Sequence, residues 1–232
     1  AAHFRTLDGL TVSSIGLGTY LGDEDDATDR AYAEAIAEAA SLGCNVFDTA
    51  INYRAQRSER VLGATLSRLL AAGTVRRDEL VVCTKGGYVP FDGGVPVDPA
   101  AYVRDTYVRA GVFGPEDLVA GSHVMTPRFL ADQIARSRRN LGLDCLDVYY
   151  LHNPETQLAH VPRGEFLARL RAVFAQLEAE VVSGHIGRYG MATWNGFRRP
   201  PGAHDHLPLA ELVGVAEAVA GREHHFRVIQ LP

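Results

Sequence analysis

Short apolar runs alternate with longer amphipathic stretches along most of the chain. The apolar runs predict six strands, near residues 14–20, 44–48, 80–85, 146–151 and 186–193 and from about residue 226 onward. Between them, apolar residues recur at helical spacing in residues 27–42, 58–70, 127–141, 164–183 and 208–220. Strands that alternate with helices predict crossover connections and a parallel sheet.

The same pattern favours a (β/α)8 TIM barrel over a doubly wound sheet. Gly16, Gly18 and Gly22 do not form the Gly-x-Gly-x-x-Gly of a dinucleotide-binding turn, and an acidic loop rather than a helix follows them. Residues 4–12 read as an N-terminal hairpin that turns at Asp8-Gly9. A complete barrel needs roughly 250 residues. We therefore expect a single domain over residues 1–232 that lacks its last two strand–helix units, and further native sequence after Pro232.

One connection is much longer than the others. Residues 86–121 are punctuated by glycine and proline, with a short helix expected near residues 99–110. Long connections in compact domains are usually functional, so this segment is expected to be a lid or a binding loop.

Composition narrows the class of protein. With 232 residues, 47% of them hydrophobic, the chain can bury one substantial core. The net charge of −5 comes without any block of like charges, and no apolar segment approaches the ~20 residues needed to span a bilayer. These features argue against nucleic-acid and membrane partners.

The three cysteines lack metal-ligand spacing and indicate reduced thiols in a cytoplasmic protein. The histidine pairs at 204/206 and 224/225 lack acidic or cysteine partners, so they are interpreted as solvated loop residues and no metal site is expected.

Candidate chemistry gathers at the ends of three successive predicted strands. Asp48 ends the second strand, and Tyr53 follows it in the next loop. Lys85, the only lysine beside 22 arginines, lies at the end of the third strand, and His152 at the end of the fourth. A carboxylate at a strand end is costly unless it is paired, so Lys85 is the expected counter-ion of Asp48.

This constellation resembles the aldo-keto reductases along the whole chain. The matching motifs are Asp-x-x-x-x-Tyr-x-x-x-x-Ser-Glu from Asp48 to Glu59, Thr-Lys-Gly-Gly around Lys85, and Leu-His-Asn-Pro around His152. The resemblance implies an NADPH (NADP+)-dependent reductase of a small aldehyde or ketone, with Tyr53 as the general acid. A free phenol has a pKa of ~10, and a neighbouring ammonium is expected to lower the pKa of Tyr53. His152 is expected to hydrogen-bond the carbonyl group of the substrate.

The resemblance also implies which residues contact the nicotinamide. They lie at the ends of the first, second, fifth and sixth strands, and are Gly18, Thr19, Tyr20, Asp48, Thr193 and Gln230. The fifth strand departs from the family pattern Gly-Val-Ser-Asn, because this chain has Gly190-Met-Ala-Thr193. Thr193 offers only a hydroxyl there, and Trp194 or Asn195 could compensate. The family's loops that bind the 2′-phosphate follow strands seven and eight, so NADP rather than NAD rests on the resemblance alone.

Two other functions stay open at this stage. The first is an aldolase that forms a Schiff base on Lys85, against which the ion pair with Asp48 argues, since pairing keeps the amine protonated. The second is a non-catalytic, cofactor-sensing subunit of the same fold. The presence of Tyr53 and His152 argues against it.

Overall fold

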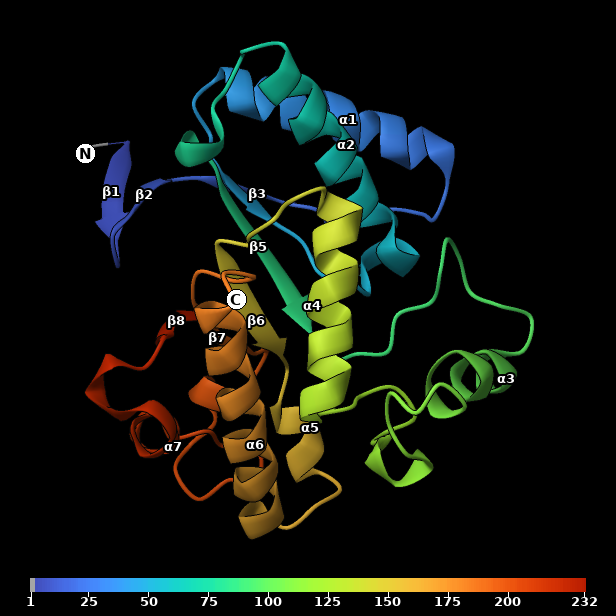
Figure 1. The fold of residues 1–232 in the computed structure, drawn as a ribbon, viewed down its shortest axis with the longest axis vertical. Helices are drawn as coiled ribbons and strands as arrows, with labels where there is room; N and C mark the ends of the chain where they lie inside the picture. The colour runs from blue at the N-terminus through green and yellow to red at the C-terminus, as the bar shows by residue number, and fades with distance from the viewer. Residues whose placement is uncertain (1–2) are drawn as a thin grey trace.

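A parallel sheet of six strands organises the computed structural model, which describes residues 3–232 (Figure 1). The strands lie side by side in chain order as β3 (Gly16–Gly18), β4 (Val46–Asp48), β5 (Val81–Gly86), β6 (Val148–His152), β7 (Tyr189–Ala192) and β8 (Phe226–Gln230). A separate antiparallel hairpin pairs β1 (Phe4–Leu7) with β2 (Leu10–Ser13). The predicted hairpin and the six predicted strands are confirmed.

Each of the first five strands of the sheet is followed by a long helix. These helices are α1 (Asp26–Ser41), α2 (Arg57–Ala71), α4 (Pro127–Leu141), α6 (Arg163–Val182) and α7 (Leu209–Ala220). Each packs on the next in chain order, so the helices form a layer over one face of the sheet. Two short helices, α3 (Pro99–Val103) and α5 (Glu155–Leu158), lie in the connections. The predicted long helices are confirmed, whereas the sequence pattern did not predict α5.

The two ends of α4 illustrate how capping residues in the sequence fix where a helix begins and ends. The Thr126 side chain accepts a hydrogen bond from the backbone N–H of Phe129, and proline occupies the first helical position. Gly142 ends the helix with φ of 65°, a left-handed conformation that glycine adopts without a steric penalty. Among the described residues, no helix is both long and apolar enough to cross a membrane.

The sheet remains open. Strands β3 and β8 are its two edges, and residues 3–232 do not form a closed barrel. All neighbouring strands are parallel and follow one another without a reversal of order. This is the strand order of the first six units of a (β/α)8 barrel, as predicted.

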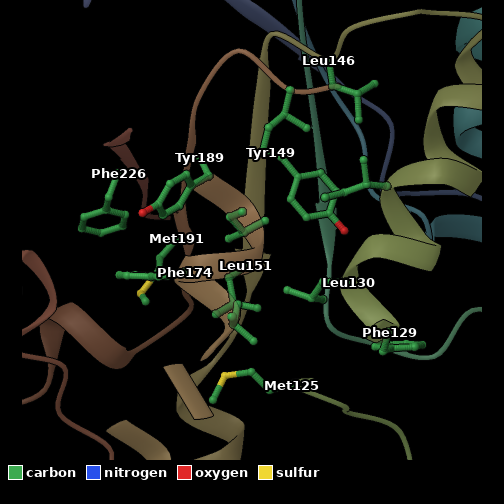
Figure 2. Close-up of a cluster of buried hydrophobic side chains, with 14 of the residues drawn as sticks. Met125, Phe129, Leu130, Leu146, Tyr149, Leu151, Phe174, Tyr189, Met191 and Phe226 are labelled. Carbon is green, nitrogen blue, oxygen red and sulfur yellow. The ribbon is translucent and has the colours of Figure 1, made fainter. Parts of the chain in front are cut away.

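The main core lies between the sheet and its helices. Figure 2 shows Tyr149, Leu151, Tyr189 and Met191 from adjacent strands packed among side chains of the helix layer. The opposite face of the sheet carries a second, smaller cluster: Val81, Cys83, Val148, Tyr150, Ala192 and Val228. Both faces of the central strands are thus buried, which explains their nearly continuous apolar sequences.

The long connection after β5 contains the short helix predicted near residues 99–110. This helix is α3, which continues into a π-helical turn at Arg104–Val108, and a 3-10 turn follows at Pro115–Asp117. The two ends of the connection are held together, since the N–H of Val89 donates to Ser122 and the N–H of Val124 donates to Gly87.

The expectation for one histidine pair is wrong. His224 is only 6% exposed, and Nδ1 of His225 lies 2.6 Å from a carboxylate oxygen of Glu178 on α6. His225 directly precedes β8 and is held against that helix, which the sequence pattern did not reveal. The three cysteines are free, with Cys83 buried and the other two partly buried.

Candidate active site at the carboxyl edge of the sheet

The carboxyl ends of the strands surround a pocket of about 410 Å³. All four proposed catalytic residues line it, although 104 positions of sequence separate Asp48 from His152. The pocket residues are Tyr20, Asp48, Asn52, Tyr53, Lys85, Tyr88, His152, Asn153, Ala192, Thr193, Trp194, Gln230, Leu231 and Pro232. Parallel strands end at the same edge of a sheet, so their terminal side chains converge there.

Asp48 and Lys85 form the predicted ion pair. Nζ of Lys85 lies 2.6 Å from Oδ2 of Asp48 and also donates to the carbonyl oxygen of Thr49 at 2.8 Å. The lysine side chain is 2% exposed and the aspartate side chain 23% exposed. Two acceptors therefore hold the ammonium group in place, and Oδ1 of Asp48 is buried without a hydrogen-bond partner.

Tyr53 lies directly over this pair. Nζ of Lys85 is 4.8 Å from the centroid of the tyrosine ring. Burial raises the pKa of Tyr53 above its ordinary value, and the negative charge of Asp48 raises it further. The expected lowering of this pKa by Lys85 is wrong, because the desolvated phenol also lies close to the carboxylate that pairs with the lysine. Tyr53 therefore remains protonated near neutral pH.

The turn after Tyr53 has an unusual backbone. Arg54, Ala55 and Gln56 all have positive φ, at 48°, 51° and 71°. Such conformations cost about 1–3 kcal/mol each in non-glycine residues. Hydrogen bonds offset this cost: Arg54 donates to the carbonyl of Asp23 at 2.7 Å and pairs with Asp29 at 2.6 Å. This strained turn connects Tyr53 to α2.

His152 faces Tyr53 across the pocket. The centroids of the two rings are 5.7 Å apart, with an interplanar angle of 78°. Burial and the nearby charge of Lys85 lower the pKa of His152 to about 3. The ring is therefore neutral at physiological pH, and its Nδ1 is buried without a hydrogen-bond partner.

The predicted nicotinamide contacts divide into two groups. Tyr20, Asp48, Thr193 and Gln230 line the pocket, whereas Gly18 and Thr19 do not. Thr19 is fully buried, and its hydroxyl donates to the carbonyl oxygen of Asp48 at 3.3 Å. Its role in the structure is to join β3 to β4. The structure thus places Gly18 and Thr19 at the end of β3, as predicted, but outside the pocket lining.

The remaining contacts fit a carboxamide group. The backbone N–H of Thr193 donates to the carbonyl of Gln230 at 3.1 Å, which places the two side chains next to each other at the pocket wall. Oγ1 of Thr193 is buried and has no partner. A buried polar atom usually has a hydrogen-bond partner, so this hydroxyl is suited to a ligand amide.

Sequence reasoning missed several residues that line or support the pocket. Tyr88 and Asn153 lie in loops without periodicity, and Asn153 has a left-handed backbone with φ of 46°. Glu155, 9% exposed, accepts hydrogen bonds from three successive backbone N–H groups that begin at Trp194, at 3.1 to 3.3 Å. Glu155 therefore fixes the loop that carries Trp194. The position of Asn153 directly after the catalytic-motif histidine was the available signal.

Successive parallel strand–helix units with polar side chains at the carboxyl ends of the strands are the architecture of (β/α)8-barrel enzymes. Comparison with known proteins identifies the family within this class. The model of the aldo/keto reductase family matches residues 14–206. The chain belongs to this oxidoreductase family, as the motifs around Asp48, Lys85 and His152 predicted.

Two curated relatives illustrate the similarity. The chain is 30% identical over 193 residues to a D-threo-aldose 1-dehydrogenase from a Pseudomonas species, covering 80% of this chain and 51% of that protein. It is 27% identical over 194 residues to the NADH-specific methylglyoxal reductase of Escherichia coli, covering 78% and 52%. The chain thus spans about half the length of these relatives.

Solved structures show the same fold. The glycerol dehydrogenase of Gluconobacter oxydans superposes with a TM-score of 0.60 at 18% identity, covering 99% of this chain and 55% of that one. The holo form of an aldo-keto reductase from Bacillus halodurans superposes with a TM-score of 0.55 at 21% identity, covering 82% and 50%.

Proposed function

We propose that the pocket interconverts a small aldehyde or ketone and its alcohol, with a nicotinamide cofactor as the hydride carrier and Tyr53 as the proton donor. The observation that carries this proposal is the arrangement of Tyr53 over the Lys85–Asp48 pair, opposite neutral His152. The cofactor supplies a hydride to the carbonyl carbon, and the protein supplies the proton for the oxygen.

The raised pKa of Tyr53 is compatible with this role. The phenol keeps its proton until negative charge develops on the substrate oxygen, and an alkoxide is a stronger base than a phenolate. Once the proton has moved, the phenolate lies beside the Lys85 ammonium, which stabilises it. We therefore assign the effect of Lys85 to the state after proton transfer.

His152 would orient the substrate. A neutral imidazole can donate one hydrogen bond to the carbonyl oxygen without placing a second cation beside Lys85. Because the pKa of His152 is about 3, it keeps this neutral form across the physiological range.

We propose that Tyr20, Thr193 and Gln230 hold the nicotinamide end of the cofactor. The unpartnered hydroxyl of Thr193 supports this assignment. The resemblance to the family favoured NADPH, whereas one relative is described as NADH-specific. Both cofactors therefore belong in the assay.

The pocket charges support a neutral substrate. Asp48 and Lys85 are the only Asp, Glu, Lys or Arg side chains among the described pocket residues, and they neutralise each other. No arginine is available there to bind a substrate carboxylate. Neutral sugars and small aldehydes fit this lining, and both relatives are named for substrates of that kind.

The aldolase alternative is less well supported. A Schiff base requires a free amine, and the ammonium of Lys85 is held by Asp48 and by the carbonyl of Thr49. The non-catalytic alternative leaves the juxtaposition of Tyr53 and His152 without a purpose.

Replacement of Tyr53 by phenylalanine tests the proposal. The variant should lose about a hundredfold or more in turnover, because it lacks the general acid. Cofactor affinity, measured by fluorescence titration, should change less than twofold. Tyr32→Phe is the matched control, because the Tyr32 hydroxyl donates to a backbone carbonyl outside the pocket. Consumption of NADH or NADPH by Tyr53→Phe at the wild-type rate would exclude Tyr53 as the donor.

A further inference from the structure

A buried histidine outside the pocket contacts the end of strand β6. His123 is fully buried, and its Nε2 lies 2.8 Å from the carbonyl oxygen of His152. His152 is the last residue of β6, and the next residue, Asn153, has a left-handed backbone. His123 thus bonds the backbone where the chain turns away from the sheet, directly at the residue that faces Tyr53.

Three side chains form a relay to this carbonyl. Nη1 of Arg169 lies 2.8 Å from Oε1 of Gln157, and Nε2 of Gln157 lies 2.9 Å from Nδ1 of His123. Gln157 is fully buried, and Arg169, on α6, is 20% exposed. The relay therefore runs from the helix layer to the rim of the pocket.

Groups that can only donate or only accept fix the direction of every hydrogen bond in the relay, and Nε2 of Gln157 also donates to the carbonyl oxygen of His123 at 3.4 Å. A guanidinium group can only donate, so Gln157 must present its oxygen to Arg169 and its NH2 group to His123. Nδ1 of His123 must then accept, and the single ring proton lies on Nε2. The carbonyl of His152, which can only accept, receives that proton.

Two further observations support this arrangement. A side chain at Gly87 would place its Cβ 2.8 Å from Nε2 of His123 and 3.2 Å from the oxygen of His152, so glycine keeps the bond free. The ring of Tyr88 is perpendicular to both His123 and His152, with centroid distances of 5.0 and 5.1 Å. Burial also keeps His123 neutral, because it lowers the pKa to about 4.

We propose that His123 is a positioning residue for His152, held in its Nε2–H tautomer by the carbonyl of His152 on one side and by Gln157, oriented by Arg169, on the other. It fixes the end of β6 and the base of the long connection to each other. The direction of the His152 ring toward Tyr53 then depends on a hydrogen bond that lies outside the pocket. The kinetic part of this proposal rests on the function proposed above, but the tautomer does not.

Nitrogen-15 NMR of histidine-labelled protein tests the tautomer directly. The signal of His123, assigned by its loss in His123→Gln, should show a protonated Nε2 and an unprotonated Nδ1 at neutral pH. Gln157→Glu should disturb it, because a carboxylate can only accept and then competes for the ring proton at Nδ1. Glu165→Gln is the matched control: it removes the other partner of Arg169 but leaves the relay intact. A wild-type Nδ1–H tautomer, or an unchanged signal in Gln157→Glu, would overturn the proposal.

Kinetics of two His123 variants test the consequence for His152. His123→Leu removes the donor, and turnover per cofactor-binding site should fall about a hundredfold, as expected for a misplaced reacting group. His123→Gln places an amide N–H near the former Nε2 and should recover at least a tenth of the wild-type turnover. Equal activity of the Leu variant and the wild type, or no recovery in the Gln variant, would refute positioning.

The two proposals can fail separately. If His123→Leu does not fold, Gln157→Glu supplies the same test, with a predicted loss of turnover that Glu165→Gln does not show. If the wild-type protein oxidises neither NADH nor NADPH with any carbonyl compound, the proposed function fails. The tautomer experiment then still decides the structural role of His123.

Discussion

Removal of Lys85 should destabilise the fold as well as the chemistry. Lys85→Met leaves Asp48 without its ion-pair partner. The other oxygen of this carboxylate, Oδ1, has no hydrogen-bond partner even in the wild type, so the carboxylate would lose its only side-chain partner. The substitution also removes the donor to the carbonyl of Thr49. Breaking a buried pair costs about 3–5 kcal/mol, and the partial exposure of Asp48 places the expected loss near 3 kcal/mol.

Urea denaturation measures this loss. With a slope of about 3 kcal/mol per molar urea, the midpoint should fall by about 1 M. The matched control is Arg76→Met, which removes an ion pair with Asp78 in which both side chains are at least 70% exposed. That variant should shift the urea midpoint far less, because water already screens an exposed pair.

A double variant separates the charge from the packing. Lys85→Met combined with Asp48→Asn removes both charges and should recover about half of the lost stability, because no uncompensated carboxylate remains. If Lys85→Met were no less stable than Arg76→Met, or if the double variant were less stable than Lys85→Met, then unpaired charge would not be the cause.

Two further predictions concern packing and pH. Gly63→Ala should cost about 1–3 kcal/mol, because its Cβ would lie 2.5 Å from a backbone oxygen of α4, whereas Gly214→Ala, with open space around it, should gain up to about 1 kcal/mol. Urea midpoints that change equally in the two variants would contradict this steric argument. Acidification should destabilise the protein, since the pKa values of His123 and His152, about 4 and about 3, lie below the ordinary value of 6.5. The unfolded chain takes up these protons below pH 6.5 and the folded chain does not, so each histidine costs about 1.4 kcal/mol per pH unit as the pH falls from 6.5 toward 4. His123→Gln should therefore lose about 2 kcal/mol less than the wild type between pH 6.5 and 5, and an equal loss would show that His123 does not titrate as described.

The sequence alone determined the strand order and three of the four proposed catalytic positions at strand ends. Asp48, Lys85 and His152 end apolar runs, and parallel strands bring their carboxyl ends to one edge. This inference needs only local hydrophobicity and the alternation of strands with helices, which are properties of short segments.

Tertiary structure alone decided the electrostatics of Tyr53. From the sequence, a lysine near a phenol was expected to lower the pKa. Whether the pKa of Tyr53 rises or falls depends on how deeply the phenol is buried and on which carboxylate the lysine already pairs with. Neither can be read from a short segment of sequence. For the same reason Thr19, adjacent to pocket residue Tyr20, bonds to β4 instead of facing the pocket.

The His123 relay was equally out of reach of the sequence. His123 lies in a loop without periodicity, 29 residues before His152, and Arg169 lies on a helix after it. Only the packing of α6 and the long connection against β6 brings these groups within hydrogen-bond distance. A difference of a few tenths of an ångström decides whether a hydrogen bond forms. The sequence pattern therefore predicts the helices and strands but not which side chains bond to each other.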